Sequence, residues 1–209
     1  MTHDAGSATS LADEQRDVAR SRILRAARTV LAERGLAATV DDVAAAAGVS
    51  RRTVFRHFAT RDGLLVAAIR DGVRRYALQI PPPPEDDDLW AWLLGLLTVT
   101  HRLNARNGRI YWELAVLPPD DLSAELAEAA VERRASRKRF ATSVTSRIWQ
   151  ARGGLGEPPP WLVDAVAVHL SGFSTQSLAG DFGRTPEEVA AVSAHVIEAS
   201  LAAALAATS

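Results

Sequence analysis

Apolar residues recur at intervals of three and four along most of this 209-residue chain. That spacing places them on one face of an α-helix, whereas a half-buried strand would alternate apolar and polar residues. No sustained alternation of that kind occurs, and no internal repeat is visible. The sequence therefore predicts an all-α fold.

Four helices are predicted in the first 80 residues. Residues 1–19 are polar and are interpreted as a flexible tail, and the helical stripe that follows ends at Gly35, a residue suited to a C-cap. Two short helices and a longer one come next, each preceded by a hydroxyl residue that can cap it. Their expected ranges are 40–47, 51–57 and 61–76, with caps at Thr39, Ser50 and Thr60.

A run of prolines at 81–84 ends this region, because consecutive prolines cannot continue a helix. We place a domain boundary near residue 80, which separates a domain of residues 20–80 from a larger one of residues 81–209. Periodicity and Pro/Gly punctuation predict five helices in the larger domain. Their approximate ranges are 88–105, 107–116, 120–151, 159–179 and 186–206. Thr185 and Glu188 predict a capping box at the start of the last one.

Composition narrows the class of protein. Hydrophobic residues make up 47% and charged residues 23% of the chain, as in soluble globular proteins. Cysteine is absent, which excludes disulfides, thiolate zinc sites and thiol nucleophiles. The N-terminus lacks the order of a secretion signal, and residues 189–208, although apolar, contain His195 and Glu198. We expect a cytoplasmic protein without a membrane segment, metal or cofactor.

Charge is distributed unevenly along a chain whose net charge is −1. Residues 1–80 carry 13 Arg against 9 acidic residues, and the remainder carries 11 basic against 16 acidic residues. A basic N-terminal part and an acidic C-terminal part suggest a polyanionic partner for residues 1–80 alone.

Residues 39–58 predict a helix-turn-helix, in which two short helices cross at a steep angle. Ala44 keeps the first helix thin at the crossing, and Gly48 permits the positive φ of a tight turn. The outer face of the second helix is basic, and such a helix fits the major groove of DNA. The predicted DNA-contact residues are Thr39, Ser50, Arg51, Arg52, Thr53, Phe55, Arg56, His57 and Arg61.

These residue types suggest separate roles. Arg51 or Arg52 can fork onto guanine O6 and N7, a contact that discriminates bases by roughly 1–3 kcal/mol. Thr39 and Arg61 stand at helix starts, where phosphates bind readily. His57 can donate a hydrogen bond to a phosphate without being charged.

Residues 20–69 resemble the N-terminal domain of the TetR family of repressors. The family pattern is T-V-x-x-I-A-x-x-A-G-V-S-x-x-T-x-Y-x-H-F-x-x-K-x-x-L. The matching positions are Thr39, Val40, Val43, Ala44, Ala47, Gly48, Val49, Ser50, Thr53, His57, Phe58 and Leu64. Phe55 replaces a tyrosine and loses its hydroxyl contact to phosphate, while Arg61 replaces a lysine and keeps the charge.

The resemblance implies a transcriptional regulator, most often a repressor, that binds a palindromic operator as a homodimer and is released by a small-molecule effector. It also implies that the helices at 159–179 and 186–206 form a hairpin that pairs with its mate in a four-helix interface. The alternative is an intramolecular packing face, but two copies are favoured because one short helix gives too little affinity alone. The predicted interface residues are Leu162, Val166, Leu170, Val189, Val192, Val196, Ile197 and Leu201.

In that family the remaining helices surround a ligand cavity. Arg133 and Arg137 interrupt the apolar stripe of the 120–151 helix and could neutralise an anionic ligand. Alternatively they pair with a carboxylate or extend to the surface, and the histidines and tryptophans belong to the core. The candidate pocket residues are Trp92, Leu96, His101, Trp112, Arg133, Arg137, Phe140, His169 and Phe173.

An enzyme and a structural DNA-binding protein are the two rival functions. An enzyme is not expected, because the chain contains no HExxH, GxSxG, GxxxxGK[ST] or ExxH pattern. A structural DNA-binding protein without an effector would need a basic surface over more of the chain. An activator remains an alternative to a repressor.

The expected mechanism is that ligand entry shifts the helices of residues 88–151, pushes the connector helix 61–76 and changes the separation of paired recognition helices.

Overall fold

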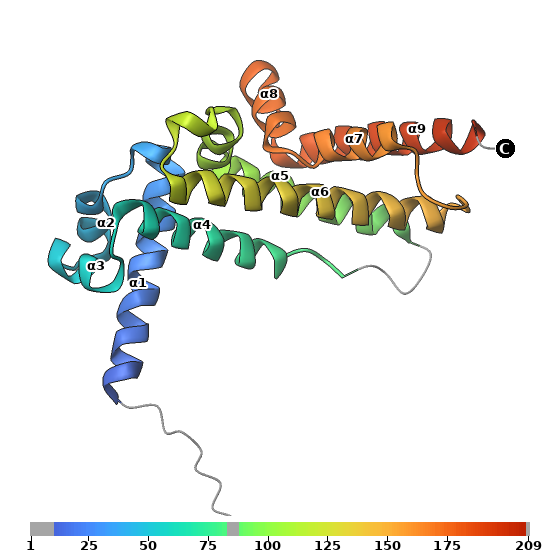
Figure 1. Ribbon diagram of the computed structural model, residues 1–209. Coiled ribbons are helices and arrows are strands. Elements are labelled where there is room, and N and C mark those ends of the chain that lie inside the picture. Colours follow the sequence, from blue (N-terminus) through green and yellow to red (C-terminus); the bar gives the residue numbers. More distant parts are fainter. Residues whose placement is uncertain (1–10, 83–87, 208–209) are drawn as a thin grey trace, which may run out of the picture. The chain divides into compact units, whose positions relative to one another are not determined.

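The computed structural model describes residues 11–82 and 88–207. Within these ranges every regular element is a helix, as Figure 1 shows, so the all-α prediction is confirmed. The chain divides into two compact units, Met1–Gly72 and Val73–Ser209. The division therefore falls inside the connector helix rather than near residue 80, and this helix belongs to both units.

The first unit is built on a small core of apolar side chains from four helices. It contains α1 (Leu11–Arg34), the short 3₁₀ helix η1 (Gly35–Ala37), α2 (Val40–Ala47), α3 (Arg51–His57) and most of α4 (Arg61–Ala77). The core side chains include Ile23, Ala27, Leu31, Val43, Val54, Leu64 and Leu65. Every helix contributes to this core, which holds α2 and α3 in place.

The tail predicted for residues 1–19 is wrong from residue 11 onward, because α1 begins at Leu11. The first turns of α1 consist of good helix formers and carry a local ion pair of 3.3 Å between Arg16 and Asp13. They lack an apolar face, so periodicity could not detect them. Residues 1–10 of the predicted tail lie outside the described part of the chain.

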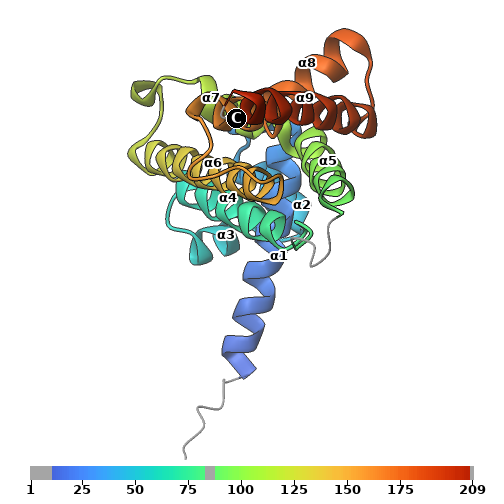
Figure 2. The same ribbon diagram turned by 90° about the vertical axis from the view of Figure 1, so that its right-hand side faces the viewer.

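The second unit is a packed set of longer helices (Figure 2). They are α5 (Leu89–Val116), the 3₁₀ helix η2 (Pro119–Asp121), α6 (Ala124–Ala151), α7 (Pro160–His169), α8 (Gly172–Phe182) and α9 (Pro186–Ala206). α5 packs against α8 and α9, and α7 packs against both α6 and α9. The core includes Leu96, Leu97, Ile148, Trp149, Leu162, Val166 and Ile197.

Two predicted helix boundaries are corrected. The ranges 88–105 and 107–116 form one helix, α5, in which the Asn107 side-chain amide donates to the Leu103 carbonyl at 3.1 Å. The range 159–179 is two helices, because α7 ends at His169 and Ser171 caps the start of α8. Its hydroxyl donates to the Val168 carbonyl at 2.6 Å and accepts from the Ser174 amide at 3.4 Å.

α9 is long and apolar enough to cross a bilayer, with a mean hydropathy of 1.7 over its most apolar stretch. Core helices of globular proteins pass the same test, and 39% of that stretch is buried within the protein. α9 packs against α5, α7 and α8, so its apolar character is explained by its place in the core of the second unit.

Candidate nucleic-acid interface

Side-chain caps define where both helices of the helix-turn-helix begin. The Thr39 hydroxyl accepts from the Asp42 amide at 3.1 Å, and the Asp42 carboxylate accepts from the Thr39 amide at 3.0 Å. The Thr39 hydroxyl also donates to the Asp42 carboxylate at 2.7 Å, and this bond together with the one from the Thr39 amide holds the pKa of Asp42 below its usual value, while Arg34 at 2.7 Å lowers it further. The Ser50 hydroxyl accepts from the Thr53 amide at 3.1 Å. The capping predictions are confirmed.

The turn between α2 and α3 depends on Gly48, whose φ of 61° is left-handed. Its amide donates to the Ala45 carbonyl at 3.1 Å, and the next amide, that of Val49, donates to the Ala44 carbonyl at 3.0 Å. The Gly48 carbonyl accepts from the Arg22 guanidinium at 2.8 Å. Arg22 thus ties α1 to the turn, a role that no local pattern in the sequence indicates.

The outer face of α3 presents arginines in two different states. Arg51 is exposed but engaged, because it lies 2.5 Å from the Asp41 carboxylate and its guanidinium carbon is 5.3 Å from the centre of the Phe55 ring. Arg52 and Arg56 are also exposed, and neither forms a hydrogen bond or ion pair with any described residue. Arg52 is therefore better placed than Arg51 to reach a base.

His57 is half-buried at the end of α3, and its Nε2 atom is buried without a hydrogen-bond partner among the described residues. Burial lowers the pKa of His57, and the positive charges of Arg56, Arg16 and Arg20 lower it further. His57 is therefore neutral at pH 7, as its predicted role requires. Arg16 and Arg20 add positive charge near this end of α3. The sequence did not predict their contribution, because the first turns of α1 carry no motif.

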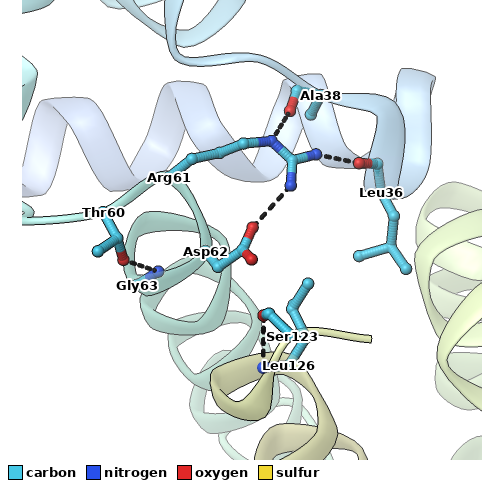
Figure 3. Close-up of polar contacts among 8 residues, drawn as sticks. All are labelled: Leu36, Ala38, Thr60, Arg61, Asp62, Gly63, Ser123 and Leu126. Carbon is cyan, nitrogen blue, oxygen red and sulfur yellow. Dashed lines mark hydrogen bonds and ion pairs between the residues drawn. The ribbon is translucent and has the colours of Figure 1, made fainter. Parts of the chain in front are cut away.

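Arg61 makes its contacts within the first unit. Figure 3 shows its guanidinium turned toward the segment that precedes α2. Nε donates to the Ala38 carbonyl at 2.9 Å, a second nitrogen donates to the Leu36 carbonyl, and the third lies 2.6 Å from the Asp62 carboxylate. With every nitrogen engaged inside the first unit, Arg61 holds that segment in place, which favours a structural role over the predicted contact with a phosphate.

We expect Arg61→Ala to lower the free energy of unfolding by about 2 kcal/mol, because two backbone carbonyls lose a charged donor. Base preference should not change. Urea unfolding measures the first effect and selection from random DNA the second. Arg52→Ala, at an exposed position, is the matched control and should change stability by less than about 0.5 kcal/mol. Weaker DNA binding by Arg61→Ala at unchanged stability would contradict this role.

The candidate pocket residues do not gather at one point. Trp92, Leu96 and His101 lie in the core of the second unit. Trp112 and Phe173 are exposed and stack on each other with ring centres 6.0 Å apart. Of the remaining candidates, His169 belongs to a buried polar group around His101. Arg133, Arg137 and Phe140 form a group of cationic and aromatic side chains on α6.

The polar group supports the core interpretation of its histidines. His101 is fully buried, with Nδ1 2.8 Å from the Thr175 hydroxyl and Nε2 3.2 Å from the Ser193 hydroxyl. His169 contacts the same Ser193 hydroxyl through Nδ1 at 3.3 Å. Burial, together with nearby His169, lowers the pKa of His101 to about 4. Both ring nitrogens of His101 are satisfied within the protein.

The predicted dimer residues need a correction. The side chains that point into the core of the second unit cannot reach a partner. These are Leu162, Val166, Leu170, Val189, Ile197 and Leu201. Val192 and Val196 are 41% and 40% exposed, and Trp161 and Val168 on α7 are 49% and 50% exposed. Both helices have the predicted apolar faces, but most of the predicted residues pack within the chain itself, which is the alternative to a dimer interface.

Comparison with known proteins agrees with this geometry. Residues 23–68 match a family described as bacterial regulatory proteins, tetR family. No curated protein matches the chain. A similar fold occurs in a transcriptional regulator from Rhodococcus sp., with a TM-score of 0.64 and 19% identity over 90% of this chain and 96% of that chain. The transcriptional regulator FadR from Bacillus subtilis in complex with stearoyl-CoA has a TM-score of 0.62 and 16% identity over 87% of this chain and 97% of that chain. The multidrug binding protein EbrR complexed with imidazole is a third similar structure, with a TM-score of 0.55 and 23% identity over 93% of this chain and 97% of that chain.

The matched residues contain the whole helix-turn-helix described above, with its caps at Thr39 and Ser50, its turn at Gly48 and the exposed arginines of α3. The structural similarity extends the shared fold over both units. Residues 23–68 are thus similar to the bacterial regulatory proteins of the tetR family.

Proposed function

We propose that this protein is a ligand-responsive transcriptional repressor of the cytoplasm that binds a palindromic operator as a homodimer. The observation that carries the proposal is the outer face of α3, where Arg52 and Arg56 are exposed and have no hydrogen-bond or ion-pair partner in the described part of the chain, while the Ser50 hydroxyl serves as a cap. A short helix with free cations beside a neutral histidine suits the major groove and the adjacent phosphates.

Selection of bound fragments from random DNA tests the proposal. We expect an inverted repeat whose half-sites are centred about one helical turn, roughly 34–36 Å, or a multiple of it, apart. A non-specific structural protein would enrich no consensus, which would overturn the proposal. Reporter expression from the selected site then separates a repressor from an activator.

Dimerisation is proposed to use the exposed apolar sides of α7 and α9. On α7, Trp161 and Val168 share one side, and on α9, Val192 and Val196 are exposed beside the buried positions. Large apolar side chains left in water on two helices that pack together are typical of a partner surface. A second copy is the partner that a two-fold operator requires.

Val196→Asp should weaken dimerisation by about 100-fold or more, because each copy would bury an unpaired carboxylate in the interface. Operator affinity should fall with it. Sedimentation equilibrium measures the first effect. Ala191→Asp, on another exposed side of α9, is the matched control and should leave the dimer intact. A fully dimeric Val196→Asp protein would contradict the proposed interface.

Ligand control is proposed to act through α4. This helix runs without a break from Arg61 to Ala77 and so belongs to both compact units. An effector that displaces α5 or α6 can thereby change the separation of the two recognition helices in the dimer. The ligands held by FadR and EbrR, which have similar folds, support a ligand-responsive protein.

A further inference from the structure

Two neighbouring arginines on α6 bring like charges together. Arg133 and Arg137 are one helical turn apart on the same face, and neither has a carboxylate partner among the described residues. Several exposed arginines elsewhere in this unit do have one. The pairs are Arg102–Glu187 at 2.6 Å, Arg109–Glu113 at 3.1 Å and Arg152–Glu198 at 3.6 Å. Arg133 is less exposed than these three arginines, yet it lacks the carboxylate partner that each of them has among the described residues.

Arg133 is half-buried, and its guanidinium carbon lies 5.4 Å from the centre of the Tyr111 ring. Its nitrogens donate no hydrogen bond to any described residue. Burial, and then the charge of Arg137, lowers the pKa of Arg133 to about 10. A guanidinium that has lost water without gaining an acceptor is unfavourable. Arg133 therefore has a contact with an aromatic face but no partner for its charge.

Arg137 lies further toward the surface and has one structural contact. It donates to the Ala167 carbonyl in the last turn of α7 at 3.3 Å. This bond uses one of its five donors, and burial lowers the pKa of Arg137 as well. The like charges of Arg133 and Arg137 repel each other, and an anion between them would remove that repulsion.

Aromatic side chains lie beside the pair. The Tyr76 ring meets the Phe140 ring edge to face, with centres 6.0 Å apart. The Tyr76 hydroxyl lies 3.0 Å from the Thr100 hydroxyl, and burial raises the pKa of Tyr76, so this phenol is neutral. Together with the Tyr111 ring beside Arg133, these side chains offer apolar surface next to two cations.

We propose that Arg133 and Arg137 bind the anionic head group, a carboxylate or a phosphate, of an organic effector whose apolar part lies against the rings of Tyr76, Tyr111 and Phe140. A planar guanidinium fork matches either head group with two parallel hydrogen bonds. This inference rests on the proposed function, because the anion is the effector of that regulator.

Calorimetric titration of the full-length protein with decanoate, decyl phosphate and 1-decanol tests the head-group requirement. We expect at least one anion to bind about tenfold or more tightly than the alcohol, since charged hydrogen bonds are the stronger ones. In the Arg133→Gln/Arg137→Gln protein this difference should vanish. Arg139→Gln, an exposed arginine on the same helix, is the matched control and should keep it. Equal binding of all three probes, or binding of none, overturns the proposal.

A second measurement separates ligand binding from a structural role. Without ligand, Arg133→Gln should melt at the same temperature as the wild type or higher, because it removes an unpaired, partly desolvated charge. A marked loss of thermal stability would instead assign Arg133 to the scaffold and overturn the proposal. Enrichment of an inverted repeat from random DNA is independent of both tests, so the DNA-binding function can stand if the anion site fails.

Discussion

Arg52→Ala is expected to relax base preference at one position of each half-site while leaving the rest of the operator consensus intact. The loss of a forked contact to a guanine corresponds to about 1–3 kcal/mol, or about 5- to 150-fold in discrimination, per half-site. Two copies of the variant contact one palindrome, so the effect on a symmetric operator approaches the square of this factor. The readout is competition between the selected operator and single-base variants of it.

Arg51→Ala provides the comparison for this result. Arg51 is already paired with Asp41 at 2.5 Å, and its guanidinium lies over the Phe55 ring. To reach a base, Arg51 would have to break these contacts, which would cost part of the energy gained. We therefore expect Arg51→Ala to reduce base discrimination less than Arg52→Ala does. If Arg52→Ala weakened binding to all sequences equally, Arg52 would be a phosphate contact and our assignment would be wrong.

The second large effect is a loss of stability in mild acid caused by His101. Its pKa is about 4 in the folded protein, whereas the unfolded value is 6.5. The unfolded chain therefore binds a proton between these values that the folded protein does not, so stability is complete above pH 6.5 and falls as the pH drops toward 4. Between pH 7 and pH 5 the loss from this residue amounts to about 2 kcal/mol. The lowered pKa of His169 acts in the same direction.

Urea unfolding at pH 7 and pH 5 measures this loss. In His101→Gln the difference between the two pH values should shrink by about 2 kcal/mol, since the amide does not titrate. His195→Gln removes an exposed histidine and serves as the matched control, with the wild-type difference retained. An unchanged pH dependence in His101→Gln would show that the buried ring does not titrate as its surroundings suggest.

Features set by residues close in sequence were predictable. The capping boxes at Thr39 and Thr185 join each hydroxyl to a carboxylate residue three positions later, and both are present. The turn at Gly48 requires a φ that glycine adopts without strain, so residue type and spacing identified it. For the same reason, the helix-turn-helix could be recognised from one continuous segment.

Features set by distant residues were not predictable. The carbonyl groups that engage Arg61 belong to residues 36 and 38, and the carbonyl that engages Arg22 belongs to residue 48. A long side chain can reach many groups, and the fold decides which one. A stripe of apolar residues likewise does not say whether a helix faces its own chain or a partner, and so Leu162 and Val166 were assigned to the wrong surface.

The central claim, that α3 reads bases in the major groove, is tested most directly by methylation interference on the selected operator. Dimethyl sulfate marks guanine N7 in the major groove and adenine N3 in the minor groove, so one experiment reports on both grooves. We predict that methylated guanines block binding in two clusters, symmetrically placed about the centre of the inverted repeat. Interference from adenine N3 alone would place the protein in the minor groove and contradict the account.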